Sequence, residues 1–425
     1  MSPDPSIRDR PPARRRAQTA IFVTVLLDLL GFGMILPILP FYAQEYGASE
    51  LQIGWLFASF SLAQLVFAPL LGKLSDRTGR RPVLLASIAA SVVAHALFAF
   101  AGSFEVLLVA RFASGLAASN FGLAQAYLAD VTPRAERSQA MGLVGAAFGL
   151  GFVLGPAFGG LLSLASTRAV PLGAAALAAA NLVLAASWLP ESLTAALRRR
   201  SREARWFDPR RLGQLARDTP LLGLMLLLFV FTLCLSLMEA TLALFLQARL
   251  GFGDTETSWL FVFIGIVMVG VQGGLIGIVV RRFGERRVIP VGMAVMAAGL
   301  LLLGQAEGLV LLGGAAALLA LGAGLHNPSL LGLLSQLAGE ESQGGILGLS
   351  RSFGSLARVL GPLAGTWIFQ RLGPPWPFRA GGVLLLLALA GALVLMHRLG
   401  ERAAATPGGR ISGEVAAEAA SQTAE

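Results

Sequence analysis

Long apolar stretches, separated by short charged or Gly/Pro-rich segments, follow one another along the whole of this 425-residue chain. A helix that crosses a bilayer needs about 20 mainly apolar residues, each adding about 1.5 Å of length. We therefore predict an all-α membrane protein with twelve transmembrane helices. The predicted spans are residues 18–42, 51–72, 82–102, 104–129, 138–164, 170–190, 220–247, 256–280, 288–305, 308–336, 344–370 and 376–397.

The composition points to lipid as the main surroundings of the chain. Hydrophobic residues make up 55% of it and charged residues only 13%, with a mean hydropathy of +0.72, whereas soluble proteins carry roughly 25% charged residues. The single cysteine, Cys234, lies inside an apolar stretch. The sequence therefore predicts neither a pair of soluble domains nor a disulfide framework.

Basic residues set the expected orientation in the membrane. Of the 33 Lys and Arg residues, 26 fall in the two tails and in the loops that follow even-numbered spans, and the opposite loops hold only Arg168, Arg249, Arg371 and Arg379. Because basic loops are retained in the cytoplasm, we expect both termini to be cytoplasmic. The net charge of +9 then orients the chain and does not indicate a nucleic-acid partner.

The longest internal polar segment divides the spans six and six. The expected parts are a cytoplasmic basic tail (1–17), an N-terminal six-helix bundle (18–194), a cytoplasmic basic linker (195–219), a C-terminal six-helix bundle (220–399) and a disordered cytoplasmic tail (400–425). The first apolar stretch is too long for a signal peptide, so we expect it to be retained. The linker either lies on the anionic inner leaflet or is a plain flexible connection.

Two local matches relate these halves. A Gly-rich basic loop begins at Gly72 and again at Gly277, an offset of 205 residues. Gly155-Pro156 of the fifth span returns as Gly361-Pro362 of the eleventh, an offset of 206 residues. We therefore expect two pseudo-symmetric bundles, a plan that recurs in transporters whose substrate site lies near the bilayer midplane.

Four motifs of the N-terminal half carry a more specific signal. The loop after the second span reads Gly72-x-Leu74-x-Asp76-Arg77-x-Gly79-Arg80-Arg81. The fifth span carries Gly142, Gly151, Gly155-Pro156 and Gly159-Gly160. The fourth span has Arg111 followed by Ser114-Gly115, and the first has Asp28 followed by Gly31, Gly33, Pro37 and Pro40. In these motifs the chain resembles the major facilitator superfamily, and within it the twelve-span drug:proton antiporters that include bacterial tetracycline exporters.

The resemblance implies a major facilitator fold with a cytoplasmic gate. In the family, the Asp of the loop lies against the N-terminus of the eleventh helix and pairs with the Arg of the loop and with an acid that ends the fourth helix. These residues correspond here to Asp76, Arg80 and Asp130. A carboxylate is favourable at a helix N-terminus, so the cluster is expected to hold the outward-open state. Topology alone explains Arg77 and Arg81 equally well.

Glycines of the two Gly-rich motifs are expected to allow tight turns and close helix packing. Gly72 and Gly79 belong to the loop. The set Gly142, Gly151, Gly155, Pro156, Gly159 and Gly160 reproduces the antiporter motif of the family, which implies export.

Charged side chains inside spans are costly and are functional candidates by default. Asp28 lies at mid-membrane depth in the first span, where burial disfavours the charged form of a carboxyl group, so we expect it to bind a proton or a cationic substrate. Glu239 in the seventh span is a second candidate. Arg111 is expected either to modulate a nearby carboxylate or to form a static bridge. Arg351 and Arg358 share a face of the eleventh span, near the expected contact with Asp76, and receive no role.

Several polar or polarisable residues are candidates for lining the substrate path, or for plain interhelical hydrogen bonds. They are Gln64, Asn120, Gln125, Met238, Gln272, His326 and Asn327. His95 occupies the place where tetracycline exporters carry an acid in the third span, which argues against tetracycline itself as the substrate.

The predicted function is the proton-coupled export of small, lipophilic or cationic compounds by a monomer in the bacterial inner membrane. The sequence carries no enzyme motif, cofactor motif or metal-ligand spacing. An exporter of an endogenous metabolite such as a sugar or amino acid is an alternative, and a membrane sensor or assembly protein that has kept the fold is another.

Overall fold

The computed structural model describes residues 11–133, 136–193, 219–337 and 339–405. Within these ranges the elements are helices and none is a strand. The predicted linker and most of both predicted tails lie outside them. The helices of the first half are α1 (Pro11–Gln44), α2 (Glu50–Thr78), α3 (Arg80–Ala99), α4 (Phe104–Ala117), the short 3₁₀ turn η2 (Ala118–Asn120), α5 (Phe121–Val131), α6 (Arg137–Ser163) and α7 (Ala169–Trp188).

The second half repeats this plan. Its helices are α10 (Thr219–Leu250), α11 (Asp254–Gly270), the π-helical turn η4 (Val271–Leu275), α12 (Ile276–Phe283), α13 (Glu285–Leu303), α14 (Leu309–Leu337), α15 (Gly339–Leu372) and α16 (Trp376–Ala405). Two predicted spans are thus interrupted, the fourth at η2 and the eighth at η4. Several helices extend beyond the apolar stretches, because their end turns continue into polar residues.

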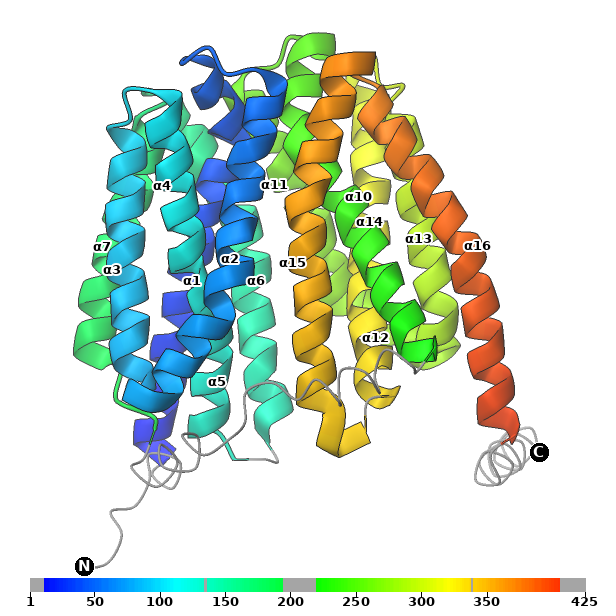
Figure 1. Cartoon of the computed structure of the whole chain (residues 1–425), viewed down its shortest axis with the longest axis horizontal. Coiled ribbons are helices and arrows are strands. Elements are labelled where there is room, and N and C mark those ends of the chain that lie inside the picture. Colours follow the sequence, from blue (N-terminus) through cyan, green and yellow to red (C-terminus); the bar gives the residue numbers. More distant parts are fainter. Residues whose placement is uncertain (1–10, 134–135, 194–218, 338, 406–425) are drawn as a thin grey trace, which may run out of the picture.

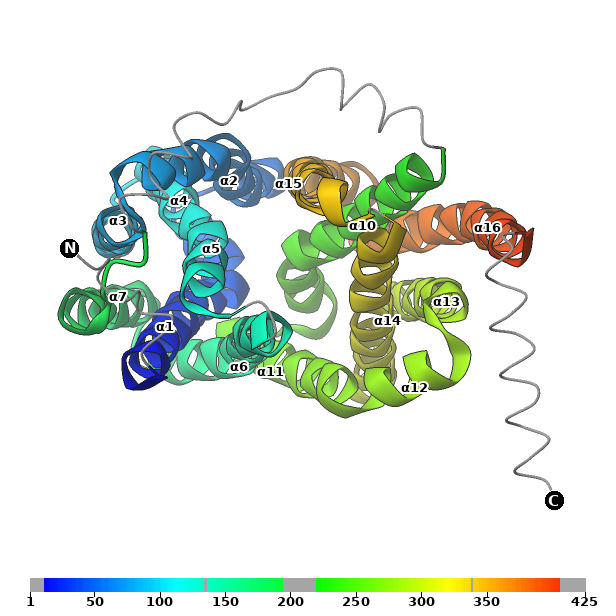
Figure 2. The same ribbon diagram turned by 90° about the horizontal axis from the view of Figure 1, so that it is seen from below.

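Eleven helices of the described ranges are long and apolar enough to cross a membrane. The helix at the eleventh predicted span, α15, does not meet that criterion although it has 34 residues. It carries Arg351, Arg358 and Arg371. Figures 1 and 2 show why a less apolar helix is tolerated there, since α15 lies between α2 of the first half and α10 of the second.

The two halves stand side by side with their long helices roughly parallel (Figure 1). The first turn of α1, the last turn of α16 and the connection between α2 and α3 lie at the same end of the molecule. This end is called the terminal end below. The arrangement agrees with an even number of crossings.

The internal repeat is visible in the backbone. Gly79 precedes α3 with a φ of 122°, and Gly284 precedes α13 with a φ of 73°. Positive φ angles favour glycine, so both residues allow the same sharp turn at equivalent places. The glycine-rich helices are also equivalent, because α6 packs along α1 in the first half and α15 packs along α10 in the second.

Contacts between the halves gather at the end opposite the termini. The Gln44 side-chain amide donates to Gln247 Oε1 at 3.0 Å, and the hydroxyls of Ser163 and Thr255 lie 3.1 Å apart. Gly54 of α2 packs so closely on Thr366 of α15 that a Cβ at this glycine would clash. These contacts join helix ends on one side of the membrane.

Candidate functional site

Asp28 lies in the middle of α1, held by two amide groups. Asn120 Nδ2 donates to one carboxylate oxygen at 2.7 Å, and Asn181 Nδ2 donates to the other at 3.0 Å. Asn181 Nδ2 also lies 3.2 Å from the Thr24 carbonyl oxygen, which ties α7 to α1. Within the described ranges no Lys, Arg or His forms an ion pair with Asp28. The carboxyl group thus keeps neutral partners.

The interruption of the fourth span sets Asn120 in place. The 3₁₀ turn η2 ends at this residue, between α4 and α5, and Asn120 is only 5% exposed. Earlier in the span, Gly115 packs on the backbone of Phe60, whose Cα would lie 2.8 Å from a Cβ at this position. Close packing of α4 on α2 therefore depends on this glycine.

Arg111 is held by aromatic rings. Its guanidinium carbon lies 4.5 Å from the centre of the Phe60 ring and 5.7 Å from that of Phe32, and the residue is 2% exposed. Such cation–π contacts stabilise a desolvated guanidinium by about 2 kcal/mol. The described contacts of Arg111 include no direct ion pair with Asp28, so the two groups have separate partners.

Several buried polar atoms of the first half lack a partner among the described residues. Those within the spans near Asp28 include Thr24 Oγ1, Asn181 Oδ1, His95 Nδ1 and Arg111 Nε. Thr24 lies one turn from Asp28, and the His95 ring lies against Gly31 of the same helix. Buried polar atoms are normally hydrogen-bonded to protein or water, so this environment suits a hydrated carboxyl group better than a dry core.

Glu239, in the middle of α10, has a different neighbour. Its charge interacts with that of Arg358 on α15, without a direct ion pair between them in the part of the chain that the structure describes. Arg358 Nη2 also donates to Ser355 Oγ at 3.3 Å. The carboxylate of the second half is therefore matched by a cation, unlike Asp28.

The arginines of α15 face the interior. Leu356, Leu360 and Trp367 are 43%, 43% and 50% exposed and lie on one side of the helix. At 3.6 residues per turn, Arg351 and Arg358 lie on the opposite side, and both are also exposed. Exposed charged groups that face away from the lipid indicate an accessible space between the halves.

Arg351 reaches the other half of the molecule. Its Nη2 donates to Gln125 Oε1 on α5, and its Nη1 would lie 3.8 Å from a Cβ at Gly122. Asp76 was expected near this helix, but the described hydrogen bonds of Arg351 and Arg358 are with Gln125 and Ser355. The contact of Asp76 with the start of α15 lies outside the described residues, since the side chains of 338–344 are not described.

The predicted gate residues form a cluster within the first half. Arg80 Nη1 lies 2.6 Å from Asp76 Oδ1, and Arg80 Nε lies 3.2 Å from Asp130 Oδ2. Glu191, which follows α7, accepts from the backbone N–H of Arg80 at 2.9 Å and of Arg81 at 3.3 Å. The cluster ties the end of α2 and the start of α3 to the ends of α5 and α7. Arg77 lies exposed beside it.

The antiporter-motif glycines divide by what they touch. A Cβ at Gly151, Gly155 or Gly159 would lie 2.6 to 2.7 Å from atoms of α1, so these residues allow α6 to pack on α1. A Cβ at Gly160 would lie 2.9 Å from Ser258 of the second half. At Gly142, and at Gly72, which lies within α2 and not in a loop as predicted, it would meet nothing within 4 Å. We expected every one of these glycines to allow close helix packing, and this prediction is wrong for Gly142 and Gly72. Pro156 is accommodated within the continuous helix α6.

The predicted lining residues differ in accessibility. Asn120, Met238 and His326 are 5%, 3% and 0% exposed and offer no surface to a ligand in this structure. Gln64 and Gln125 are half-buried, and Gln272 and Asn327 are exposed. Gln272 lies in the π-helical turn η4, a feature that often occurs at functional sites.

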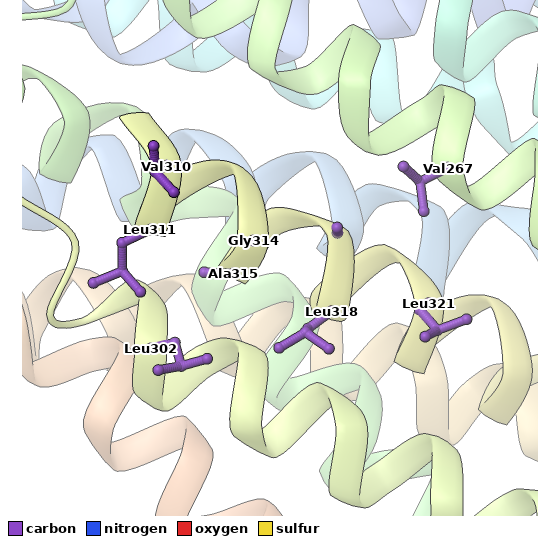
Figure 3. Close-up of a pocket in the computed structure, with 9 residues that line it drawn as sticks. Val267, Leu302, Val310, Leu311, Gly314, Ala315, Leu318 and Leu321 are labelled. Carbon is purple, nitrogen blue, oxygen red and sulfur yellow. The ribbon is translucent and has the colours of Figure 1, made fainter. Parts of the chain in front are cut away.

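An apolar groove on the second half is a separate feature (Figure 3). It is lined by Val267 of α11, Leu302 of α13 and a row of α14 that includes Val310, Leu318 and Leu321, and its volume is about 650 Å³. Val310 is 93% exposed. The groove offers aliphatic groups alone, which suits contact with lipid and cannot hold a proton or an ion.

Two contacts of the site escaped the sequence analysis. Asn181 carries no motif signal, although an Asn in an otherwise apolar span is itself an indication of a buried hydrogen bond. Glu191 lies one residue beyond the predicted sixth span (170–190) and carries no motif signal either. Among described residues, no group of three His, Cys, Asp or Glu side chains could hold a metal ion.

The chain has many relatives among known transporters. The sequence profile of the Major Facilitator Superfamily matches residues 21–279 and 272–419. The class C tetracycline resistance protein of Escherichia coli is 34% identical over 380 residues, which cover 88% of this chain and 95% of that protein. Multidrug resistance protein 2 of Bacillus subtilis (strain 168) is 27% identical, over 91% of this chain and 98% of that protein.

Solved structures of transporters share the fold of this chain. The crystal structure of the human organic anion transporter MFSD10 (TETRAN) superimposes with a TM-score of 0.68 at 29% identity, covering 89% of this chain and 99% of that one. A bacterial homologue of the human lysosomal transporter Spinster, in an inward-facing conformation, gives a TM-score of 0.71 at 15% identity, covering 90% and 97%. From its sequence profile, its relatives and its fold, this chain is a multi-pass membrane protein that belongs to the Major Facilitator Superfamily of transporters.

Proposed function

We propose that the protein exports small lipophilic compounds in exchange for protons, by alternating access of a site between its two halves. The single observation that carries the proton coupling is the environment of Asp28. This carboxyl group lies at mid-span, is partly accessible, and has two neutral amide donors as partners.

Neutral partners matter because they leave both protonation states possible. A carboxylate locked to an arginine stays charged, since proton uptake would leave a buried cation unpaired. Asp28 has no such tie, and Asn181 can rotate its amide to present its unpartnered Oδ1 to a protonated carboxyl group. The rotation gives up the 3.2 Å contact of Nδ2 with the Thr24 carbonyl oxygen, but it keeps Asp28 hydrogen-bonded in both protonation states.

Alternating access would use the contacts between the halves. The contacts at Gln44, Ser163 and Gly54 close the end opposite the termini in this structure. With both termini in the cytoplasm, as the basic loops predict, this is a conformation that faces inward. The cluster around Arg80 would then meet the start of α15 when the terminal end closes. Coupling requires that proton and substrate bind the two conformations with different affinity.

The proposed direction of transport, export, follows from the relatives. Bacterial relatives include proteins named for tetracycline and multidrug resistance, which supports export across a bacterial inner membrane. We propose that the protein acts as a monomer. The glycines of α6 are the residues that the resemblance links to export.

The test uses purified protein in liposomes with an imposed pH gradient and a panel of neutral and charged drugs. Gradient-driven transport is expected for wild type and should fall to the level of empty liposomes for Asp28→Asn, with folding unchanged. Normal proton-driven transport by that variant would remove Asp28 from the mechanism. Transport of a sugar or amino acid, with drugs ignored, would support the metabolite exporter, and no transport of any compound would support a sensor or assembly protein.

A further inference from the structure

Of the three arginines inside predicted spans, Arg111, Arg351 and Arg358, Arg351 is the one with neither an aromatic ring nor an opposite charge among its described partners. Asp28 has two amide donors, Arg111 has two aromatic rings, and Glu239 and Arg358 have each other. Arg351 has one described side-chain partner, Gln125, which is neutral and belongs to the other half. An arginine inside a span normally faces a partner or an accessible polar space.

The position of Arg351 is accessible and lies beside aromatic surface. Arg351 is exposed on the interior side of α15, and its guanidinium lies over Gly122 and Gln125 of α5. Phe121, one turn before Gln125, lies on the same side of α5. Its ring contacts Phe148, which stacks on Phe152, with ring centres 6.4 and 5.4 Å apart.

These features together fit one kind of ligand. A guanidinium group binds carboxylate-like anions with two parallel hydrogen bonds, and the neighbouring rings offer an apolar surface to the rest of the molecule. Gln125 supplies one neutral acceptor, which a charged acceptor would outcompete.

We propose that the substrates are amphiphilic organic anions whose anionic group displaces Gln125 from Arg351, while their apolar part lies against Phe121 and Phe148. The inference rests on the proposed function, because it names the substrate class of the same exporter. The sequence led us to expect lipophilic or cationic substrates. The proposal keeps the lipophilic character and excludes cations, because Arg351 would repel them.

A structural role for Arg351 makes the opposite prediction for one variant. If the hydrogen bond to Gln125 only ties the halves together, Arg351→Gln and Gln125→Ala remove the same tie and shift ligand binding in the same direction. If Arg351 receives an anion, Arg351→Gln weakens binding, whereas Gln125→Ala frees the guanidinium and leaves binding equal or tighter.

The experiment measures equilibrium binding to the full chain in nanodiscs made of neutral lipid. The probes are aromatic carboxylates of increasing size, with 1-pyrenebutyrate as the largest, and for each carboxylate its methyl ester and the matching trimethylammonium compound. We expect the carboxylates to bind most tightly. Arg351→Gln should weaken their binding roughly tenfold or more, as expected for the loss of a charged hydrogen bond, and should leave the esters unchanged. Arg351→Lys should retain part of the preference.

Three results would overturn the proposal: no carboxylate binds, a trimethylammonium probe binds more tightly than its carboxylate, or the Arg351 and Gln125 variants shift carboxylate binding in the same direction. The wild-type preference and Gln125→Ala decide the question even if Arg351→Gln fails to fold. No gradient is present in nanodiscs, so loss of proton coupling would leave this result intact. Anion binding without gradient-driven transport would contradict the proposed function alone.

Discussion

The two halves differ most at one pair of equivalent positions. In the first half, Asp28 of α1 accepts a hydrogen bond from Asn120 of the interrupted fourth span. In the second half, the corresponding place holds Phe231 of α10, whose ring stacks on that of His326 of α14 with centres 4.0 Å apart. A polar contact in one half is thus replaced by a ring stack in the other.

The correspondence follows from how the glycine-rich helices pack. A Cβ at Gly155 would meet Leu30 and Gly33 of α1, and a Cβ at Gly361 would meet Leu233 and Ser236 of α10. Two residues before Leu30 is Asp28, and two residues before Leu233 is Phe231. The fourth span agrees, because Asn120 and His326 share the offset of 206 that relates the glycine motifs.

A second pair of positions shows the same pattern at the terminal end. Arg80 binds Asp130 in the first half, and at the offsets of the repeat Gln336 Nε2 donates to Glu285 at 2.8 Å in the second. The contact is retained while the charges are changed. The repeat therefore preserves helix packing and contact positions, and each half fills them with its own chemistry.

The comparison separates the roles of the two acids. Glu239 lies eight residues after Phe231, which is about 12 Å along the helix, so it is not the counterpart of Asp28. It has Arg358 as its electrostatic partner. We infer that proton coupling belongs to the first half, and that the second half contributes a matched charge pair and the interior arginines.

The largest expected effect separates Asp28 from Glu239. Asp28→Asn should remove the dependence of transport on the pH gradient, whereas Glu239→Gln should lower the rate and retain the dependence. The reason is that only the first change removes the group held by neutral donors. Initial rates in liposomes at a series of gradients measure both variants. If transport by Glu239→Gln did not depend on the pH gradient, and transport by Asp28→Asn kept the normal dependence, proton coupling would belong to Glu239.

Packing glycines should respond alike in both halves. Gly155→Ala and Gly361→Ala each place a methyl group against backbone of the partner helix, and such overpacking costs about 1 to 3 kcal/mol. The thermal unfolding of purified protein should show a lower midpoint for both. Gly142→Ala is the matched control from the same motif, because its methyl group would meet nothing within 4 Å. A loss of stability in the control equal to that of Gly155→Ala would contradict the packing account.

The charge pair of the second half should show coupling that Asp28 lacks. Glu239→Gln leaves the Arg358 charge unmatched and should destabilise the protein, and the double variant Glu239→Gln/Arg358→Gln should recover part of the loss. Coupling energies of neighbouring groups are about 0.5 to 3 kcal/mol. A double-mutant cycle on thermal stability measures the coupling energy between Glu239 and Arg358. Strict additivity of the two changes would show that the charges do not interact.

The smallest effect is expected at the terminal end. Arg80→Gln breaks two partly exposed ion pairs, with Asp76 and Asp130, each worth about 0.2 to 1 kcal/mol. Gln336→Ala removes the bond of the second half that is equivalent to the contact with Asp130. Both should change thermal stability only slightly. Transport should slow more for Arg80→Gln, because its cluster is the one proposed to meet the start of α15. Equal transport rates for the two variants would contradict a gating role for the cluster around Arg80.

Much of the fold could be predicted from the sequence, because span length and basic loops follow directly from the properties of the bilayer. Residues such as Gly155 and Gly361 also revealed the repeat. The interruptions at η2 and η4 could not be predicted, since Asn120 and Gln272 lie within continuous apolar runs. The sequence pointed to Asp28 but not to Asn181, because a partner from a distant helix leaves no local pattern. The neutral contacts of Arg351 were likewise set by the packing of the two halves.

The central claim is that Asp28 carries the exchanged proton, and difference infrared spectroscopy tests it most directly. On binding of a transported compound, the carbonyl band of a protonated carboxyl group should disappear in wild type and in Glu239→Gln, and should be missing from the difference spectrum of Asp28→Asn. A band that persists in Asp28→Asn and is lost in Glu239→Gln would contradict the claim.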